Sequence, residues 1–236
     1  MSDLIAITPV KNSLATTIET LQSVSQAKGI FDYIIFDDFS NQETASYLDQ
    51  HAKSLNYQVI HLKDHIDSPS PNYRTTLIMA QEKALEKKAD LVIVESDVIV
   101  KPETLKGLHE TANSLESPGL VGSVTTDEQG TINFPYLHIK EHHPEVISSN
   151  RSLSFCCTLL TNEFLATFDF NQLNIGKDWY DVAISKKSKS LGFNNYVIKK
   201  LPVQHHPHSS RPWKQEKYSN PIAYYFKKFF LGRDKI

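Results

Sequence analysis

The stretch that most constrains the fold runs from Leu91 to Val98, where an apolar run ends in two carboxylates, Glu95 and Asp97, separated by one residue. Four consecutive apolar residues after the charged segment 86–90 predict a strand that is buried on both faces, as in a parallel sheet. The two carboxylates then lie at the carboxyl end of this strand. Because open α/β sheets bind ligands at that edge, the pair is a candidate ligand site, with two solvated acids as the alternative.

Short apolar runs alternate with helix-like segments along the first half of the chain. Strands are predicted at 4–10, 33–36, 57–62 and 91–94, with helices at 13–24, 43–55 and 73–88 between them. This alternation is typical of βαβ units and a parallel sheet. Pro9, which lacks a backbone N–H, is expected to stop the first strand.

The second half of the chain is expected to complete the same domain. Helices are predicted at 102–115, 163–168 and 179–191, strands at 120–124, 153–160 and 193–198, and a long loop or short hairpin at 127–151. The fold class is therefore α/β, with a mostly parallel central sheet flanked by helices.

The composition excludes some classes of protein. The chain has 236 residues, 25 of them basic and 27 acidic, and its net charge of −2 gives no reason to expect a nucleic-acid partner. Cys156 and Cys157 are adjacent, so we expect two small buried thiols in a reducing compartment. No leading charged-then-apolar segment and no run of 18 apolar residues is present, which favours a cytoplasmic protein.

A second pair of acids, Asp37 and Asp38, follows the second predicted strand. Since the carboxyl ends of parallel strands meet at one edge, this pair should lie near Glu95 and Asp97. A carboxylate after the second strand suits hydrogen bonds from the base or sugar of a nucleotide, and the pair on the central strand suits a hard divalent cation that bridges phosphates. Capping of the next helix is the alternative role for Asp37 and Asp38.

Three motifs, taken in order, resemble those of family-2 inverting glycosyltransferases of the GT-A fold. They are Thr8-Pro9-Val10, Asp37-Asp38-Phe39-Ser40 and Glu95-Ser96-Asp97. The resemblance implies a single GT-A-like domain whose nucleotide-sugar site is built from these segments. It implies that Asp97 binds Mn²⁺ or Mg²⁺ and that the donor is contacted by the others, namely Thr8, Pro9, Asp37, Asp38, Glu95 and Ser96.

Two later motifs extend the resemblance to about residue 210. Tyr180-Asp181-Val182-Ala183, followed by Gly192-Phe193, is similar to the helix start that carries the family's catalytic base, which implies that Asp181 is the base. Asp178, three residues earlier, is a second candidate. The segment from Val203 to Ser209 matches the pattern of the family's third metal ligand at His205. His206 and His208 remain alternatives for that ligand.

Two further side chains flank these motifs. Arg74, at the start of the helix before the central strand, is expected either to pair with a donor phosphate or to lie solvated. Trp179 is expected either to stack on the acceptor sugar or to pack in the core.

The last stretch of the chain interleaves aromatic residues with lysines from Trp213 to Lys228. We expect a glycosyltransferase domain at 1–212 and an aromatic and basic extension at 213–236. As a helix, the extension suits docking at an anionic membrane surface, at the cytoplasmic face, where lipid-linked acceptors reside. Packing on the domain or at a homodimer contact is the alternative.

The predicted function is transfer of a sugar, with inversion, from a nucleotide-diphosphate donor to a glycan or lipid-linked acceptor hydroxyl, as in polysaccharide biosynthesis. One alternative is a nucleotidyltransferase, although the Gly-rich phosphate loop of that class is absent after the first strand. The other is a non-catalytic subunit that binds nucleotide sugars or glycans. That alternative is suggested by Glu95 and Ala183, which stand where the family usually has aspartate and a second acid.

Overall fold

The computed structural model describes residues 3–140, 144–175 and 179–206. The chain divides into two compact units, Met1–His205 and His206–Ile236. The first unit contains all the helices and strands given below. The predicted extension at 213–236 lies outside the described residues, so the predicted division at residue 212 stays a prediction.

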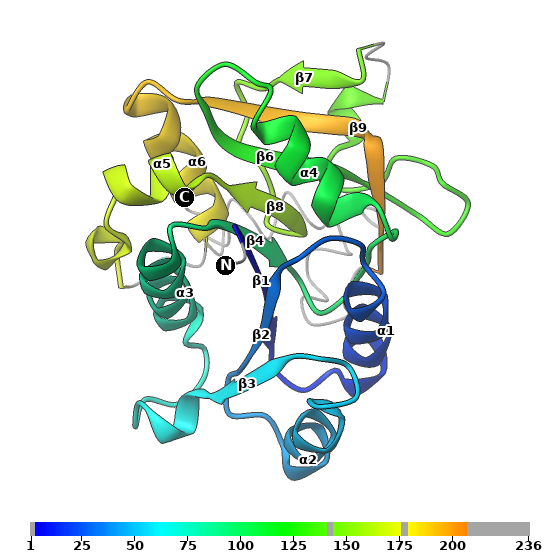
Figure 1. Cartoon of the computed structure of the whole chain (residues 1–236), viewed down its shortest axis with the longest axis vertical. Helices are drawn as coiled ribbons and strands as arrows, with labels where there is room; N and C mark the ends of the chain where they lie inside the picture. The colour runs from blue at the N-terminus through cyan, green and yellow to red at the C-terminus, as the bar shows by residue number, and fades with distance from the viewer. Residues whose placement is uncertain (1–2, 141–143, 176–178, 207–236) are drawn as a thin grey trace, which may run out of the picture. The chain divides into compact units, whose positions relative to one another are not determined.

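Within the described residues, nine strands form one sheet in the order β3-β2-β1-β4-β8-β6-β9-β5, with β7 paired to β9 (Figure 1). The strands are β1 Leu4–Val10, β2 Asp32–Asp37, β3 Gln58–His61, β4 Asp90–Val94, β5 Val98–Ile99, β6 Pro118–Thr126, β7 Val146–Ser148, β8 Cys157–Leu160 and β9 Asn194–His205. The α-helices are α1 Leu14–Ser25, α2 Gln42–His51, α3 Tyr73–Lys87, α4 Thr104–Ala112, α5 Asn162–Thr167 and α6 Tyr180–Ser190. Short 3₁₀ helices lie at Leu62–Asp64, Leu137–Ile139 and Phe170–Gln172.

The first half of the sheet is parallel, as the βαβ pattern predicts. Strand β1 pairs in parallel with both β2 and β4, and β2 pairs in parallel with β3. Antiparallel strands enter after β4, because β8 runs opposite to both β4 and β6. The predicted α/β architecture is confirmed, and its second half is a mixed sheet.

Strand β4 is buried on both faces, as its apolar sequence predicts. Successive side chains of a strand point to opposite faces. Leu91 and Ile93 accordingly belong to one hydrophobic cluster, and Val92 and Val94 belong to the other. All four side chains are fully buried. The segment that follows, 95–97, is thus anchored in the middle of the sheet.

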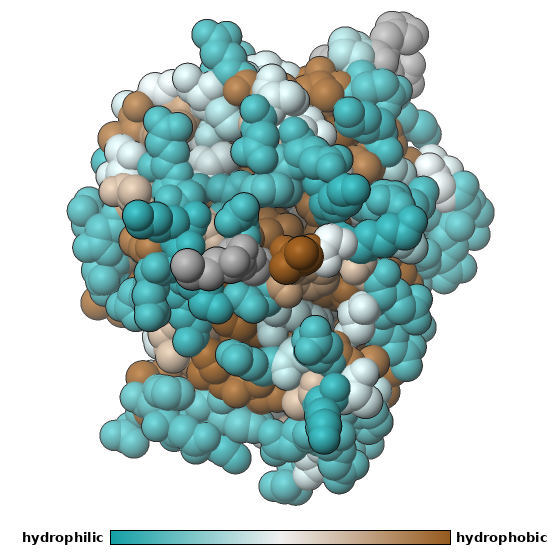
Figure 2. Space-filling model, viewed as in Figure 1, coloured by the Kyte–Doolittle hydropathy of each residue, from teal (hydrophilic) through white to brown (hydrophobic). Residues whose placement is uncertain are grey.

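Helices cover both faces of the sheet (Figure 1). Helices α3, α5 and α6 cover one face, through core side chains such as Leu77, Phe164 and Ile184. Helices α1, α2 and α4 cover the other face, through core side chains such as Leu21, Leu48 and Leu108. Hydrophilic side chains cover most of the surface seen in Figure 2. None of the helices in the described part of the chain has the length and apolar character needed to cross a membrane.

Two strands differ from the prediction near their carboxyl ends: Pro9 does not stop β1, and β9 runs further than predicted. Strand β1 continues through Pro9 to Val10. Its pairing with β4 ends at Ile7, so beyond that residue β1 has a neighbour on one side only, where a residue without an N–H is tolerated. Strand β9, predicted to end at residue 198, continues to His205 because β6 pairs with it as far as Gln204, and β7 and then β5 pair with it as well.

The other elements lie close to their predicted positions. The helix predicted at 102–115 is the shorter α4, and the one predicted at 43–55 is the shorter α2. The irregular segment 127–151 contains β7 and one 3₁₀ turn in its described part. The strand predicted at 153–160 begins only at Cys157, where pairing with β4 starts.

A buried glutamine joins α3 to the chain that leads towards α6. The amide nitrogen of Gln81 donates to the carbonyl oxygens of Leu165, at 2.8 Å, and Phe168, at 2.6 Å, and its amide oxygen accepts from the backbone N–H of Phe170 at 2.8 Å. Gln81 is 4% exposed. A single side chain therefore satisfies three backbone groups that would otherwise be buried without partners.

We predict that Gln81→Leu lowers the free energy of unfolding by on the order of 3 kcal/mol, because each buried group left without a partner costs about 1–3 kcal/mol. The matched control is Glu82→Leu at the next, exposed position, where a change within about 0.5 kcal/mol is expected. Urea unfolding followed by circular dichroism measures both. Equal effects of the two substitutions would contradict this role for Gln81.

Candidate functional site

The site begins with an aspartate and a histidine that strand pairing brings together. After β4, the turn 95–97 leads into β5, and β5 pairs antiparallel with the end of β9 so that Val98 lies opposite His205. The Asp97 Oδ2 and His205 Nε2 atoms are 3.4 Å apart, and their side chains are 5% and 9% exposed. Two residues that are 108 positions apart in the sequence thus share one buried location.

The imidazole of His205 is oriented by the backbone. Its Nδ1–H donates to the carbonyl oxygen of Phe134 at 3.2 Å, which directs Nε2 towards Asp97. Burial acts to lower the pKa of His205, but the hydrogen bond and charge of Asp97, with the charge of Glu95, raise it above 6.5. A ring nitrogen held by a backbone carbonyl is the arrangement that fixes the orientation of metal-binding histidines.

Asp97 and His205 fit a divalent cation. Carboxylate oxygen and imidazole nitrogen are both metal ligands in proteins. Two ligand atoms that lie 3.4 Å apart can both bond the same ion, at about 2.0–2.2 Å from each. Within 3–140, 144–175 and 179–206, no group of three or more His, Cys, Asp or Glu side chains is placed to hold an ion. An ion held here would therefore rely on further oxygen ligands from a substrate or from water.

Glu95 lies beside this pair and is held by a cysteine. The Cys156 thiol donates to Glu95 Oε2 at 3.7 Å, and the backbone N–H of Glu95 donates to the carbonyl oxygen of Cys156 at 3.0 Å. Burial, followed by the charges of Asp97 and Asp181, raises the pKa of Glu95 to about 7. Both cysteines are buried and free, as predicted, but the contact between Cys156 and Glu95 joins strands that the sequence alone does not pair.

Asp181 belongs to the same group of charges. It lies in the first turn of α6, where its Oδ1 accepts from the N–H of Val182 at 2.8 Å. Its charge raises the pKa of Glu95 and contributes to raising that of Tyr73, behind burial and the charge of Glu95. The structure thus brings Glu95, Asp97, Asp181 and His205 together. Asp178 lies outside the described residues.

Trp179 and Ser96 lie next to these residues in the chain. Trp179 precedes α6, is partly buried, and accepts a hydrogen bond at its carbonyl oxygen from the N–H of Ala183 at 3.1 Å. Ser96 lies in the turn between β4 and β5. The predicted contacts of Trp179 with an acceptor and of Ser96 with a donor stay predictions.

Asp37 is buried at the end of β2, and each of its carboxylate oxygens contacts another group of the protein. Its Oδ1 accepts from the N–H of Ser40 at 3.1 Å, and its Oδ2 lies 2.7 Å from Nδ1 of His61. Nε2 of His61 in turn lies 2.9 Å from Oδ1 of Asp49. His61 was not selected from the sequence, because only the pairing of β3 with β2 brings it to Asp37.

Asp38 ties the chain before α3 to the edge of the sheet. Its Oδ2 accepts from Ser70 Oγ and from the N–H of Asn72, and its Oδ1 accepts from Asn72 Nδ2, each at 2.8 Å. The alternative that Asp37 or Asp38 caps the next helix is wrong, because the side chain of Asn41 caps α2. Asp38 instead joins the loop after β2 to the start of α3.

Two of the residues predicted to contact the sugar donor, Thr8 and Arg74, form hydrogen bonds within the protein. The Thr8 hydroxyl is fully buried and forms a hydrogen bond with the Tyr33 hydroxyl at 2.9 Å. Pro9 is partly buried near the end of β1. The Arg74 guanidinium donates to the carbonyl oxygens of Leu173, at 2.8 Å, and Asn171, at 2.5 Å. Donor contacts of Thr8, Pro9 and Arg74 stay predictions, and Arg74 anchors the segment that approaches α6.

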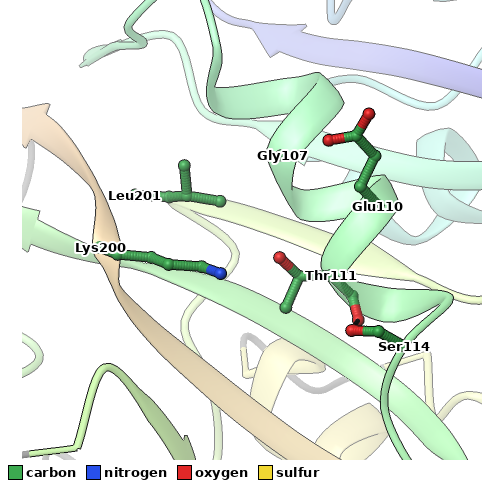
Figure 3. A pocket seen from close by; sticks show the side chains of 6 residues that line it. All are labelled: Gly107, Glu110, Thr111, Ser114, Lys200 and Leu201. Atoms are coloured by element: carbon green, nitrogen blue, oxygen red, sulfur yellow. Dashed lines mark hydrogen bonds between the residues drawn. The ribbon is translucent and has the colours of Figure 1, made fainter.

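A separate pocket of about 300 Å³ lies between α4 and β9. Figure 3 shows its six lining residues, Gly107, Glu110, Thr111, Ser114, Lys200 and Leu201. Glu110 also lies 3.6 Å from Lys106, one turn earlier on the helix. This lining contains none of the predicted site residues, so the candidate site is defined by the carboxylates at the end of β4.

The bridge between Asp37, His61 and Asp49 makes stability depend on pH. Burial acts to lower the pKa of His61, but its hydrogen bonds to the two carboxylates raise it above 6.5. A histidine with a raised pKa in the folded protein stabilises it fully below the unfolded value, and this contribution is lost as the pH rises through the folded value.

We therefore predict that the difference in free energy of unfolding between wild type and His61→Gln is larger at about pH 5.5 than at about pH 8.5. Urea unfolding across this range measures the difference. Asp49→Asn, which removes the more exposed partner, should weaken this pH dependence without abolishing it, since Asp37 remains. A stabilising effect of His61 that grows with pH would contradict the assignment.

Comparisons with known proteins bear on this fold and site. A family model described as Glycosyl transferase family 2 matches residues 5–161. No curated protein matches the chain in a sequence comparison.

Solved structures show the fold. S. aureus TarS matches with a TM-score of 0.65 and 18% identity, over 92% of this chain and 38% of that one. The mannosyltransferase PcManGT from Pyrobaculum calidifontis, in complex with GDP-Man and Mn²⁺, matches with a TM-score of 0.64 and 13% identity, over 97% and 64%. S. aureus TarS 1-349 in complex with UDP-GlcNAc matches with a TM-score of 0.63 and 18% identity, over 87% and 59%. The chain thus spans less than two thirds of each, and the predicted GT-A fold is confirmed.

Proposed function

The chain belongs to glycosyl transferase family 2, and from that premise we propose that it transfers a sugar from a nucleotide-diphosphate donor to an acceptor hydroxyl, with inversion at the anomeric carbon. The observation that carries the proposal is the convergence of Glu95, Asp97, Asp181 and His205 beyond the end of β4. These residues come from three separate parts of the chain, and they supply a metal-binding pair and a candidate base.

The donor is held, in this proposal, at the loops after β1 and β2 and at the start of α3. These three segments are bonded to one another: the Asp38 N–H donates to the carbonyl oxygen of Val10 at 2.8 Å, and Asp38 accepts from Asn72. A set of loops fixed in this way can offer backbone groups and the predicted donor residues to a nucleotide without paying for ordering on binding. The complexes of PcManGT with GDP-Man and of TarS with UDP-GlcNAc support a nucleotide sugar as the donor class.

Asp97 and His205 are proposed to bind Mn²⁺ or Mg²⁺ together with the donor diphosphate. Such an ion offsets the negative charge that builds on the departing diphosphate. Support comes from the short distance between Asp97 Oδ2 and His205 Nε2, from the backbone hydrogen bond that orients the ring, and from the Mn²⁺ in the PcManGT complex. A site with two protein ligands suits an ion that takes its other ligands from substrate phosphates and water.

Asp181 is proposed to be the general base. The acceptor oxygen bonds to the anomeric carbon as the bond from that carbon to the diphosphate oxygen breaks, and the hydroxyl proton passes to the Asp181 carboxylate. Positioned proton transfer of this kind typically contributes about 10²- to 10⁴-fold. Asp178 remains the second candidate for this role. A glycan or lipid-linked acceptor, membrane contact through 213–236 and a homodimer also remain proposals.

We predict that nucleoside diphosphates raise the melting temperature of the wild type only in the presence of Mn²⁺. A ligand at 100 times its dissociation constant stabilises the folded state by about 2.7 kcal/mol. Asp97→Ala and His205→Gln should abolish this stabilisation, whereas the matched variant His206→Gln should keep it. Thermal-shift measurements with UDP, GDP and dTDP test the assignment. Loss of the effect in His206→Gln, with retention in His205→Gln, would transfer the ligand role to His206.

We predict that Asp181→Asn lowers the rate of sugar transfer by about 10²-fold or more while leaving donor binding unchanged. The substitution keeps the shape of the side chain and removes its ability to accept a proton. Transfer is measured by release of the nucleoside diphosphate in the presence of acceptor, and binding by calorimetry. If Asp178→Asn has this effect and Asp181→Asn does not, the base is Asp178, three residues earlier in the chain.

The same measurements separate this function from a non-catalytic role. Ala183, where the family usually has a second acid, packs against the hydrophobic core and leaves Asp181 as the acid of that turn. Retained nucleotide binding, with no sugar transfer or donor hydrolysis in the wild type, would favour a binding subunit. The family match supports glycosyl transfer over nucleotidyl transfer.

A further inference from the structure

We propose that the hydroxyl of Tyr73 is a substrate contact that hydrogen-bonds the donor's sugar ring between Glu95 and Asp181. Tyr73 is the first residue of α3 and was not among the site residues selected from the sequence. The inference rests on the proposed function and goes beyond it by naming a residue that recognises the sugar rather than the nucleotide.

The hydroxyl oxygen of Tyr73 is buried, and among the described residues it has no hydrogen-bond partner. Buried polar groups in folded proteins are normally bonded, and leaving one without a partner costs about 1–3 kcal/mol. Five other tyrosine hydroxyls in the described residues have a partner within 3.5 Å, namely those of Tyr33, Tyr57, Tyr136, Tyr180 and Tyr196. The Tyr73 hydroxyl therefore needs a separate explanation.

The position of Tyr73 is fixed by its neighbours in the chain. Asn72, directly before it, donates two hydrogen bonds to Asp38, each of 2.8 Å. The Tyr73 ring packs against the hydrophobic core, and its centroid lies 6.3 Å from that of Tyr180, the residue before Asp181. A ring held in this way keeps its hydroxyl in one place.

The charges around the hydroxyl are those of the proposed active site. Burial, followed by the charges of Glu95 and Asp181, holds the pKa of Tyr73 well above 10. The phenol therefore keeps its proton and remains a hydrogen-bond donor. Glu95 is occupied in part by the Cys156 thiol at 3.7 Å, so the phenol is a donor group in a region rich in acceptors.

The reaction geometry explains what reaches this hydroxyl. The donor diphosphate is proposed to bind at Asp97 and His205, and the acceptor oxygen must approach Asp181. The sugar ring lies between the diphosphate and the acceptor, because its anomeric carbon exchanges its bond to the diphosphate oxygen for a bond to the acceptor oxygen. Its hydroxyl groups are acceptors for a phenol, and the phenol oxygen can accept from them in turn.

The test uses Tyr73→Phe, which removes only the hydroxyl, and compares nucleotide sugars with the matching nucleoside diphosphates by calorimetry in the presence of Mn²⁺. The probes are UDP-GlcNAc with UDP, GDP-mannose with GDP, and dTDP-glucose with dTDP. We expect the variant to bind the nucleotide sugar about 10-fold more weakly than the wild type and the nucleoside diphosphate equally well, because a lost hydrogen bond of about 1.4 kcal/mol corresponds to a tenfold change.

Stability separates this role from a structural one. Tyr73→Phe should keep or raise the melting temperature, because it removes a buried group without a partner. The control Tyr57→Phe, which removes a hydroxyl bonded to the carbonyl oxygen of Leu48 at 2.9 Å, should lower the melting temperature and leave sugar recognition unchanged.

Two outcomes overturn the inference in different ways. Equal affinity of Tyr73→Phe and wild type for the nucleotide sugar, with binding clearly present, would contradict the role of Tyr73 and leave the proposed function standing. Failure of the wild type to bind any of these nucleotide sugars or diphosphates would contradict the proposed function, and the inference with it.

Discussion

The antiparallel pairing of β5 with the end of β9 is the contact on which the candidate site depends. It joins the turn after the central strand to the last strand of the domain and places Val98 opposite His205. The pairing is possible because β9 continues for 12 residues and changes partners along its length. Without it, Asp97 would have no imidazole beside it, and the carboxylates at the end of β4 would remain a cluster of like charges.

The same cluster of acids supports the proposal that this site binds a cation. Burial, and after it the nearby charges of Asp97 and Asp181, raise the pKa of Glu95 to about 7. His205, the Cys156 thiol and the neutral Tyr73 phenol supply positive charge or hydrogen-bond donors around these acids. A divalent ion bound with a diphosphate would add positive charge at this point and substrate oxygens to complete its coordination. In this proposal, the electrostatics of these few side chains serve the family's activity.

The sequence predicts the parts of the fold and site that depend on local pattern. The apolar run before Glu95 predicts β4 and the position of Asp97 because a strand buried on both faces must be continuously hydrophobic. The extent of β9 was missed because Lys199, Lys200 and Pro202 interrupt the apolar pattern, and only its partner strands carry it to His205. Contacts between distant segments were also missed, such as those of His61 with Asp37 and of Cys156 with Glu95, because no local spacing encodes them.

The central claim, that Asp97 and His205 hold a cation against a donor diphosphate, is tested most directly by pulsed electron paramagnetic resonance of Mn²⁺ in the presence of a nucleoside diphosphate. The account predicts two couplings to the bound ion, one from phosphorus of the diphosphate and one from an imidazole nitrogen, with the nitrogen coupling absent in His205→Gln. Bound Mn²⁺ that shows neither coupling in the wild type would contradict the account.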